Sequence, residues 1–261
     1  MKIVFVGSGN LATQLSLGLK DSGHSIIQVF SRSIENAKQL ADKLGAEYTN
    51  DLQHISPDAE LYFFSVKDDI LGEVIHNFPA TKGVLVHTAG AISMNVFKGR
   101  KERYGVFYPL QTFNKNRKID FHQIPVFLEA SDNEASTCLE EIAKSVSDHF
   151  QFLSSEKRQY LHLAAVFACN FTNHMYVLAS NLLKDQGLEF DVLKPLISET
   201  ANKVMELSPQ LAQTGPAVRF DENVIQKHIS LLKDDAIQEL YIKLSKSIHS
   251  HNLYNQSKNK V

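Results

Sequence analysis

Short apolar runs alternate with stretches of helical periodicity along the first half of the chain. Between the first runs, Leu11–Lys20 and Ile34–Leu44 place apolar residues at helical spacing. Strands that alternate with helices form parallel sheets with right-handed crossovers, so the pattern predicts an α/β fold with a doubly wound parallel sheet. The runs that we predict as strands are Ile3–Val6, Ile26–Phe30, Leu61–Val66, Val84–His87, Val106–Tyr108, Val126–Glu129 and Phe150–Leu153.

After residue 153 the pattern is helical only. Glu156–Lys184 has the periodicity of one long helix, with Ser155 as a candidate N-cap. We predict further helices at Phe190–Leu207 and Glu222–Ile248, a loop at Ser208–Asp221 and a frayed tail at His249–Val261. The change of pattern predicts two domains, an α/β domain at 1–153 and an all-α domain at 154–261.

Composition narrows the class of protein. The 261 residues are 43% hydrophobic with a formal net charge of −2, which argues against a general nucleic-acid binder. Cys138 and Cys169 lie far apart in the sequence and match no disulfide or metal-site spacing, so we expect no metal and a reducing, cytoplasmic location. No uninterrupted apolar stretch of about 18 residues occurs, so we expect no membrane partner. A small-molecule enzyme or binding protein is the simplest class that remains.

A glycine-rich turn follows the first predicted strand and opens the first predicted helix. It has the form G-x-G-x-x-A. The first glycine of such a turn permits the bend, the second lets a pyrophosphate approach the backbone, and the small last residue allows helix and strand to pack closely. The free N–H groups of the helix N-terminus then bind phosphate. The residues predicted to bind a dinucleotide are Gly7, Ser8, Gly9, Asn10, Leu11 and Ala12. The alternative is a tight turn without a ligand.

The residues after the second predicted strand distinguish between cofactors. An NAD site usually has Asp or Glu at this place, whereas this chain has Ser31, Arg32 and Ser33. A guanidinium pairs with a 2′-phosphate, so the sequence favours NADP over NAD. The alternative is a solvated Arg32 with Ser33 capping the next helix.

Because carboxyl ends of strands line the ligand crevice, we also expect Val66 and Lys67 near the cofactor, unless Lys67 is a surface lysine.

With these motifs, the first domain adopts a Rossmann-type pattern and resembles pyrroline-5-carboxylate reductase and its NADP-dependent relatives. Prephenate dehydrogenases and 6-phosphogluconate-dehydrogenase-like enzymes are more distant likenesses. The whole chain resembles Rossmann-like proteins with a DUF2520 C-terminal domain. The segments that carry this resemblance are His87–Ser93, Tyr108–Phe113, the helix around His162 and Asn170, and Thr214–Asp221 followed by His228.

This resemblance implies an NADP-binding oxidoreductase but no particular reaction. Two positions depart from the pattern of the relatives: Tyr108 replaces a frequent His, and Phe220 replaces a frequent Gly. The first departure puts a proton-transfer role at that position in doubt.

Two strand ends carry candidate site residues. His87 and Ser93 flank a loop of small residues and are candidates to orient a substrate carbonyl or imine, with His87 suited to proton transfer. The alternative is that His87 satisfies a loop carbonyl and Ser93 caps a helix. Gln111 and Thr112 follow another strand, and their short polar side chains suit them to bind a substrate. The alternative is that they belong to a packed interdomain linker.

The long predicted helix carries the remaining catalytic candidates. At about 100° per residue, its polar residues fall on one stripe and its apolar residues opposite, which predicts a helix buried on both sides. We expect His162 to donate a proton and Asn170 to orient the substrate; a core or dimer-forming helix is the alternative. Arg219 is predicted to hold a substrate carboxylate or phosphate, or else to pair with Asp221 or Glu222.

These features predict transfer of hydride between NADPH and a small imine or carbonyl substrate. The competing prediction is a non-catalytic NADP-binding sensor or interaction protein. We expect a homodimer formed through the helical domain.

Overall fold

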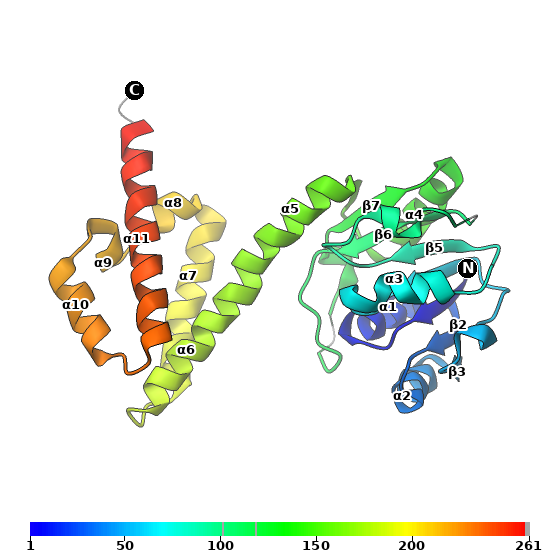
Figure 1. Cartoon of the computed structure of the whole chain (residues 1–261), viewed down its shortest axis with the longest axis horizontal. Helices are drawn as coiled ribbons and strands as arrows, with labels where there is room; N and C mark the ends of the chain where they lie inside the picture. Colours follow the sequence, from blue (N-terminus) through cyan, green and yellow to red (C-terminus); the bar gives the residue numbers. More distant parts are fainter. Residues whose placement is uncertain (101, 118, 259–261) are drawn as a thin grey trace. The chain divides into compact units, whose positions relative to one another are not determined.

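The protein is described from a computed structural model that covers residues 1–100, 102–117 and 119–258 (Figure 1). Its contacts divide the chain into two compact units, Met1–Met175 and Tyr176–Val261, which are treated separately. These units differ from the predicted domains 1–153 and 154–261, which describe a division of function and stay a prediction. The first unit extends further because the start of the long helix packs against the sheet.

The first unit is built on one eight-stranded sheet in the order β3-β2-β1-β4-β5-β6-β7-β8. Strands β1 to β6 run parallel, β7 is antiparallel to β6, and β8 runs parallel to β7. Strand order reverses between β1 and β4, as in a doubly wound Rossmann sheet, so the predicted fold class is confirmed. The strands are β1 (Lys2–Val6), β2 (Ser25–Phe30), β3 (Glu47–Thr49), β4 (Leu61–Phe64), β5 (Val84–His87), β6 (Tyr104–Pro109), β7 (Val126–Ala130) and β8 (Phe150–Phe152).

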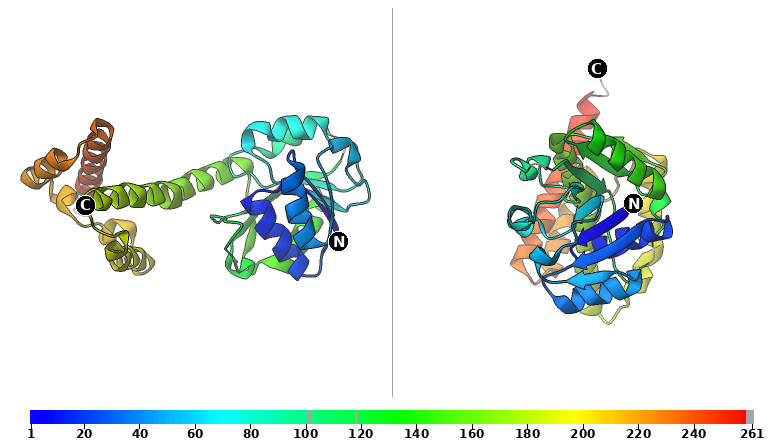
Figure 2. Two further views of the ribbon diagram at one scale, coloured as in Figure 1. Left: turned by 90° about the horizontal axis from the view of Figure 1, so that it is seen from below. Right: turned by 90° about the vertical axis from the view of Figure 1, so that its right-hand side faces the viewer.

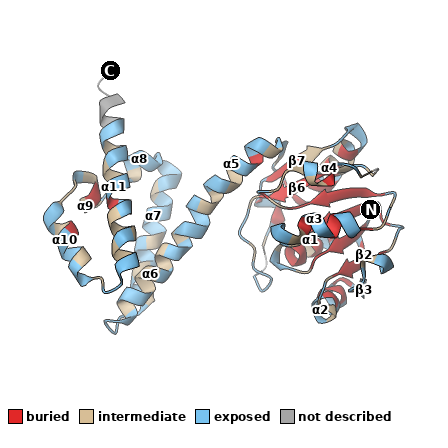
Figure 3. Cartoon of the chain, in the orientation of Figure 1, coloured by how far each residue is buried: buried red, intermediate tan, exposed pale blue. Residues whose placement is uncertain are grey.

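Helices cover both faces of this sheet (Figures 1 and 2). Alternate strand residues point to opposite faces, so in β1 Phe5 joins one core cluster and Val4 the other. The Phe5 cluster includes residues of α1 (Asn10–Asp21), α2 (Ile34–Leu44) and α4 (Asn133–Val146). The Val4 cluster includes residues of α3 (Asp68–Asn77) and of the 3-10 helix η2 (Met94–Phe97). Figure 3 shows the central strands almost entirely buried between these layers.

The long helix is interrupted by a π-helical segment. It consists of α5 (Ser155–Ala165), the π-helix η4 (Val166–Phe171) and α6 (Thr172–Lys184). Its N-cap is Ser154, whose hydroxyl accepts a hydrogen bond from the Lys157 N–H at 3.4 Å, and not Ser155 as predicted. The predicted burial on both sides is wrong for the single chain, in which Tyr160 is 70% exposed (Figure 3).

The second unit contains helices only. The predicted helix Glu222–Ile248 is two helices, because Asp234 accepts a hydrogen bond from the Ala236 N–H at 2.8 Å and caps a new start. The predicted loop at Ser208–Asp221 contains two short helices, and the predicted frayed tail is helical to Lys258, beyond which the chain lies outside the described residues. The elements are η5 (Phe190–Leu193), α7 (Lys194–Glu206), α8 (Pro209–Ala212), α9 (Pro216–Arg219), α10 (Glu222–Leu231) and α11 (Asp235–Lys258). Within the described ranges, no helix is both long and apolar enough to cross a membrane.

Candidate active site

The glycine-rich turn has the geometry of a phosphate cradle. Gly7 has a φ of 128°, and a Cβ there would lie 2.2 Å from the Ser65 carbonyl oxygen, so only glycine allows the turn to pack against the end of β4. A Cβ on Gly9 would meet nothing within 4 Å, and Gly9 caps α1 without a side-chain hydrogen bond. The backbone at Gly9 is therefore open to a ligand at the point where α1 begins, so these residues fit a pyrophosphate.

The other residues predicted in this turn have structural contacts. Ser8 donates a hydrogen bond from its hydroxyl to the Ser31 hydroxyl at 2.9 Å, which ties the turn to the end of β2. The Asn10 side-chain oxygen accepts from the Lys115 N–H at 3.2 Å. Ala12 is fully buried, as close packing of helix and strand requires. Leu11 is half-buried and packs against the core of the sheet.

The residues after β2 and β4 lie at the same edge of the sheet as the turn. Arg32 is exposed, and its guanidinium makes no ion pair or hydrogen bond with any residue that the structure describes. Ser33 caps α2 by accepting a hydrogen bond from the Asn36 N–H at 3.2 Å, which is its structural alternative. Lys67 is exposed just before α3, and Val66 is half-buried. Arg32 is thus free to meet a phosphate.

A cavity of about 400 Å³ brings several predicted residues together at the end of β6. The Tyr108 hydroxyl and His162 Nδ1 form a hydrogen bond of 2.9 Å, at a position where the sequence had put a proton-transfer role in doubt. Burial raises the pKa of the Tyr108 hydroxyl above its usual value, so this group stays protonated at neutral pH. The lining residues are Tyr108, Leu110, Gln111, Thr112, Leu161, His162, Ala164, Ala165, Ala168, Cys169 and Asn170.

Gly90, in the loop after β5, leaves the space that the rings of Tyr108 and His162 occupy. A Cβ on Gly90 would lie 2.6 Å from both Cγ and Nδ1 of His162 and 2.9 Å from Cζ of Tyr108. These separations are far below van der Waals contact, so only glycine leaves room for both rings. Gly90 therefore helps to hold His162 where it meets Tyr108.

We expect Gly90→Ala to destabilise the protein by about 1–3 kcal/mol, because the added methyl group overpacks the site and displaces the His162 ring. Gly72→Ala is the matched control: a Cβ there would meet only Val96 at 3.9 Å, and alanine stabilises a helix interior by about 0.5–1 kcal/mol. Urea denaturation measures both free energies of unfolding. Equal effects of the two substitutions would show that the contact at Gly90 does not constrain His162.

His87 does not fit the proton-transfer role predicted for it. Its ring is fully buried, stacks on Phe97 with centroids 5.7 Å apart, and accepts a hydrogen bond at Nδ1 from the Ala89 N–H at 3.1 Å. Burial lowers the pKa of His87 to about 3, so the ring is uncharged at neutral pH and does not act as a general acid there. Ser93 caps η2 by accepting from the Asn95 N–H at 3.2 Å. Ser93 thus adopts the structural alternative that the sequence left open, whereas the hydrogen bond of His87 comes from a loop N–H and does not go to a loop carbonyl.

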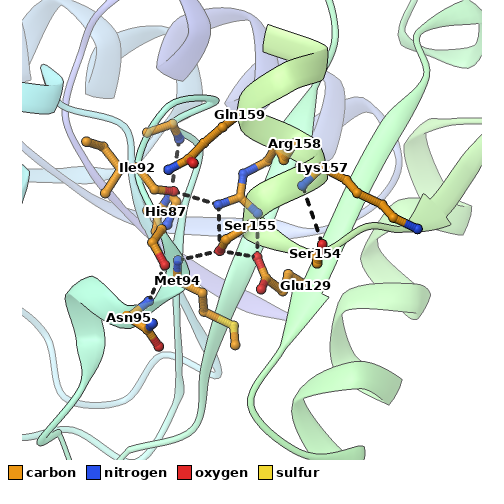
Figure 4. A network of polar contacts seen from close by, with 12 residues as sticks. His87, Ile92, Met94, Asn95, Glu129, Ser154, Ser155, Lys157, Arg158 and Gln159 are labelled. Carbon is orange, nitrogen blue, oxygen red and sulfur yellow. Dashed lines mark hydrogen bonds and ion pairs between the residues drawn. The ribbon is translucent and has the colours of Figure 1, made fainter. Parts of the chain in front are cut away.

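Sequence reasoning also missed a buried ion pair that holds the start of α5 (Figure 4). Arg158 is 1% exposed, and its guanidinium donates to Glu129 Oε2 on β7 at 2.5 Å and to the Ile92 carbonyl at 2.6 Å. Ser155 donates to the same Glu129 oxygen at 2.7 Å and accepts from the Met94 N–H at 2.9 Å. Nothing in the sequence distinguishes this arginine from an exposed one.

This network fixes α5 against the sheet one turn before His162. Because positions four apart on a helix share a face, the anchored Arg158 also determines where the His162 side chain leaves the helix. The network therefore belongs to the support of the cavity and not to its lining.

Arg219 lies in the second unit and is not among the residues that line this cavity. It ends α9 and is exposed. Among the described residues, Arg219 forms neither of the alternative ion pairs, with Asp221 or with Glu222; Asp221 instead caps α10 by accepting from the Val224 N–H at 3.3 Å. Phe220, at the position where relatives often have Gly, has φ 53° and ψ 52°, a left-handed conformation that glycine adopts more easily.

A Rossmann sheet with a phosphate cradle, followed by a helix that lines a cavity at the carboxyl ends of the strands, defines a nicotinamide-dependent oxidoreductase class. Residues 2–90 match the family model described as NADP oxidoreductase coenzyme F420-dependent, and residues 124–248 match the domain of unknown function DUF2520. A crystal structure of a "putative NADP oxidoreductase" from Bacteroides fragilis is 52% identical, with coverage of 95% of this chain and 98% of that one and a TM-score of 0.90. The chain belongs to this family of Rossmann-type NADP oxidoreductases with a DUF2520 domain.

Other solved structures extend the likeness. A protein from Thermotoga maritima is 26% identical over 97% of this chain and 99% of that one, with a TM-score of 0.71. A pyrroline-5-carboxylate reductase from Coxiella burnetii shares the fold at 18% identity, with 97% of each chain covered and a TM-score of 0.57. No curated protein matches the chain. The family confirms the predicted NADP-binding Rossmann domain, while the roles of individual residues stay predictions.

Proposed function

We propose that the protein reduces a small imine or carbonyl compound with NADPH. The observation that carries the proposal is the Tyr108–His162 hydrogen bond on a cavity at the edge of the sheet where the glycine-rich turn lies. A reductive aminase from Aspergillus terreus, which shares the fold at 14% identity and a TM-score of 0.71, is seen with NADPH and ethyl-5-oxohexanoate. This neighbour supports a substrate with a carbonyl group.

Each group of site residues has a distinct task in this proposal. The N–H groups at the start of α1 bind the pyrophosphate, and Arg32 pairs with the 2′-phosphate. When bound, NADPH supplies the hydride. The Nδ1 atom of His162 is hydrogen-bonded to the Tyr108 hydroxyl, which leaves Nε2 to protonate the substrate oxygen or nitrogen. Asn170 orients the reacting group with its amide, and Gln111 and Thr112 hold the substrate.

The test is loss of NADPH absorbance in the presence of a panel of imines, ketones and aldehydes, with NADPH affinity measured in parallel by calorimetry. Turnover of any member supports a reductase. Tight NADPH binding without any turnover supports the competing function, a non-catalytic NADP-binding sensor or interaction protein. The homodimer, the cytoplasmic location and substrate binding by Arg219 stay predictions.

We expect Arg32→Ala to raise the Kd for NADPH about 10- to 100-fold and to leave the Kd for NADH unchanged, because a charge-assisted hydrogen bond contributes about 1.5–3 kcal/mol. Calorimetric titration with each coenzyme measures this. Arg103→Ala is the control, since Arg103 is exposed and lies before β6, at the opposite edge of the sheet. An equal loss of affinity for both coenzymes would remove Arg32 from the 2′-phosphate.

A further inference from the structure

We propose that the cavity selects an uncharged substrate, namely a small ketone, aldehyde or imine without a carboxylate or phosphate group. This inference rests on the proposed function and adds the substrate class to it. It is drawn from the chemistry of the eleven described residues that line the cavity, all of which lie in the unit Met1–Met175.

The lining contains both apolar and polar residues. Three alanines of the long helix, Ala164, Ala165 and Ala168, lie in the lining together with Leu110 and Leu161. Because alanine side chains are short, they leave space for an apolar substituent of the substrate. The polar lining residues carry amide, hydroxyl, thiol and imidazole groups, which suit one polar reacting group. They are Tyr108, Gln111, Thr112, His162, Cys169 and Asn170.

None of these lining residues is Lys, Arg, Asp or Glu. An ion that leaves water without a partner loses several kcal/mol of solvation, so a carboxylate would be disfavoured here. His162 is the lining side chain to which the proposed function assigns proton donation. If it paired with a carboxylate, that pairing would hold its proton and oppose transfer of the proton to the reacting group.

The reaction balances with an uncharged substrate. The substrate carbon receives the hydride that NADPH loses as it is oxidised to NADP⁺, and the π bond of C=O or C=N breaks. The oxygen or nitrogen takes the proton from His162, and solvent later restores that proton. The product is a neutral alcohol or an amine.

A neighbouring cavity of about 730 Å³ offers the clearest alternative. It shares Gln111 and Thr112 with the first cavity and is also lined by Arg117. A substrate with a carboxylate would have to reach this guanidinium. Arg117→Ala therefore distinguishes the two possibilities: it removes a preference for acids if one exists and leaves a preference for neutral compounds unchanged.

The first experiment compares substrates that differ only in a carboxylate: ethyl levulinate with levulinate, and 1-pyrroline with 1-pyrroline-5-carboxylate. With saturating NADPH at pH 7, we expect kcat/KM to be about 10²-fold higher for the neutral member of each pair. A preference for the acids, or equal values, overturns the proposal. Ligand-observed NMR on the protein with NADP⁺ measures binding of the same pairs, so a protein that binds the neutral members without turnover supports the selectivity and contradicts the reductase.

The second experiment places a cation in the cavity. Ala168 is exposed on the helix, so Ala168→Lys is expected to fold and to raise binding and kcat/KM of the acids relative to the neutral members. Ala80→Lys makes the same substitution before β5, at the opposite edge of the sheet, and should not change the ratio. An unchanged ratio in Ala168→Lys would show that this cavity does not receive the substrate.

Discussion

His162→Ala is expected to lower kcat for reduction by about 10²- to 10⁴-fold, the usual contribution of a general acid. The Nδ1 atom of His162 is held by Tyr108 at 2.9 Å, so the other ring nitrogen is the one available to a substrate in the cavity. NADPH affinity should not change, because the phosphate cradle lies on other residues. Stopped-flow measurement of NADPH oxidation under saturating coenzyme, together with calorimetry, separates the two effects.

Two further variants make this prediction specific. His76→Ala removes an exposed histidine of α3 and should leave kcat unchanged. Tyr108→Phe keeps His162 but removes its hydrogen bond, so kcat should fall less and the pH dependence of kcat should shift. Full turnover by His162→Ala would assign the proton to another group.

Much of the sheet could be predicted because parallel strands are buried on both faces and appear as continuous apolar runs. Val84–His87 and Ile34–Leu44 match the observed β5 and α2 at both ends. The strand β3 was missed because it has three residues, Glu47–Thr49, none of them buried. The break before Asp235 was missed because no Gly or Pro marks it.

The candidate site was predictable only where local sequence determines geometry. The turn at Gly7 is a local motif and could be recognised from the sequence. The end of a strand is also a local feature, so Gln111 and Thr112 could be placed after a strand, at the carboxyl edge of the sheet, where both line the cavity. Side-chain direction was not predictable: His87 also ends a strand, but its ring points into the core beside Phe97. The hydrogen bond between Tyr108 and His162 was not predicted, because the two residues lie 54 positions apart in the sequence.

The buried ion pair of Arg158 shows how such long-range contacts control the site. We expect Arg158→Met to lower the free energy of unfolding by about 3–5 kcal/mol, because it leaves Glu129 without its cation in a region where the arginine is 1% exposed. Urea denaturation followed by circular dichroism measures the change. Hydrogen exchange of the α5 amides shows whether the loss is local to the helix that carries His162.

Arg103→Met is a close control, because Arg103 pairs with Glu134 at the same 2.5 Å but is 44% exposed, and surface pairs contribute about 0–1 kcal/mol. The double variant Arg158→Met/Glu129→Leu should recover much of the loss, since replacing both members of a buried pair by apolar residues is often neutral. Such recovery means that the pair contributes little net stability and instead determines how α5 is placed. If Arg158→Met costs no more than Arg103→Met, the helix is held by its apolar contacts, and the position of His162 does not depend on the ion pair.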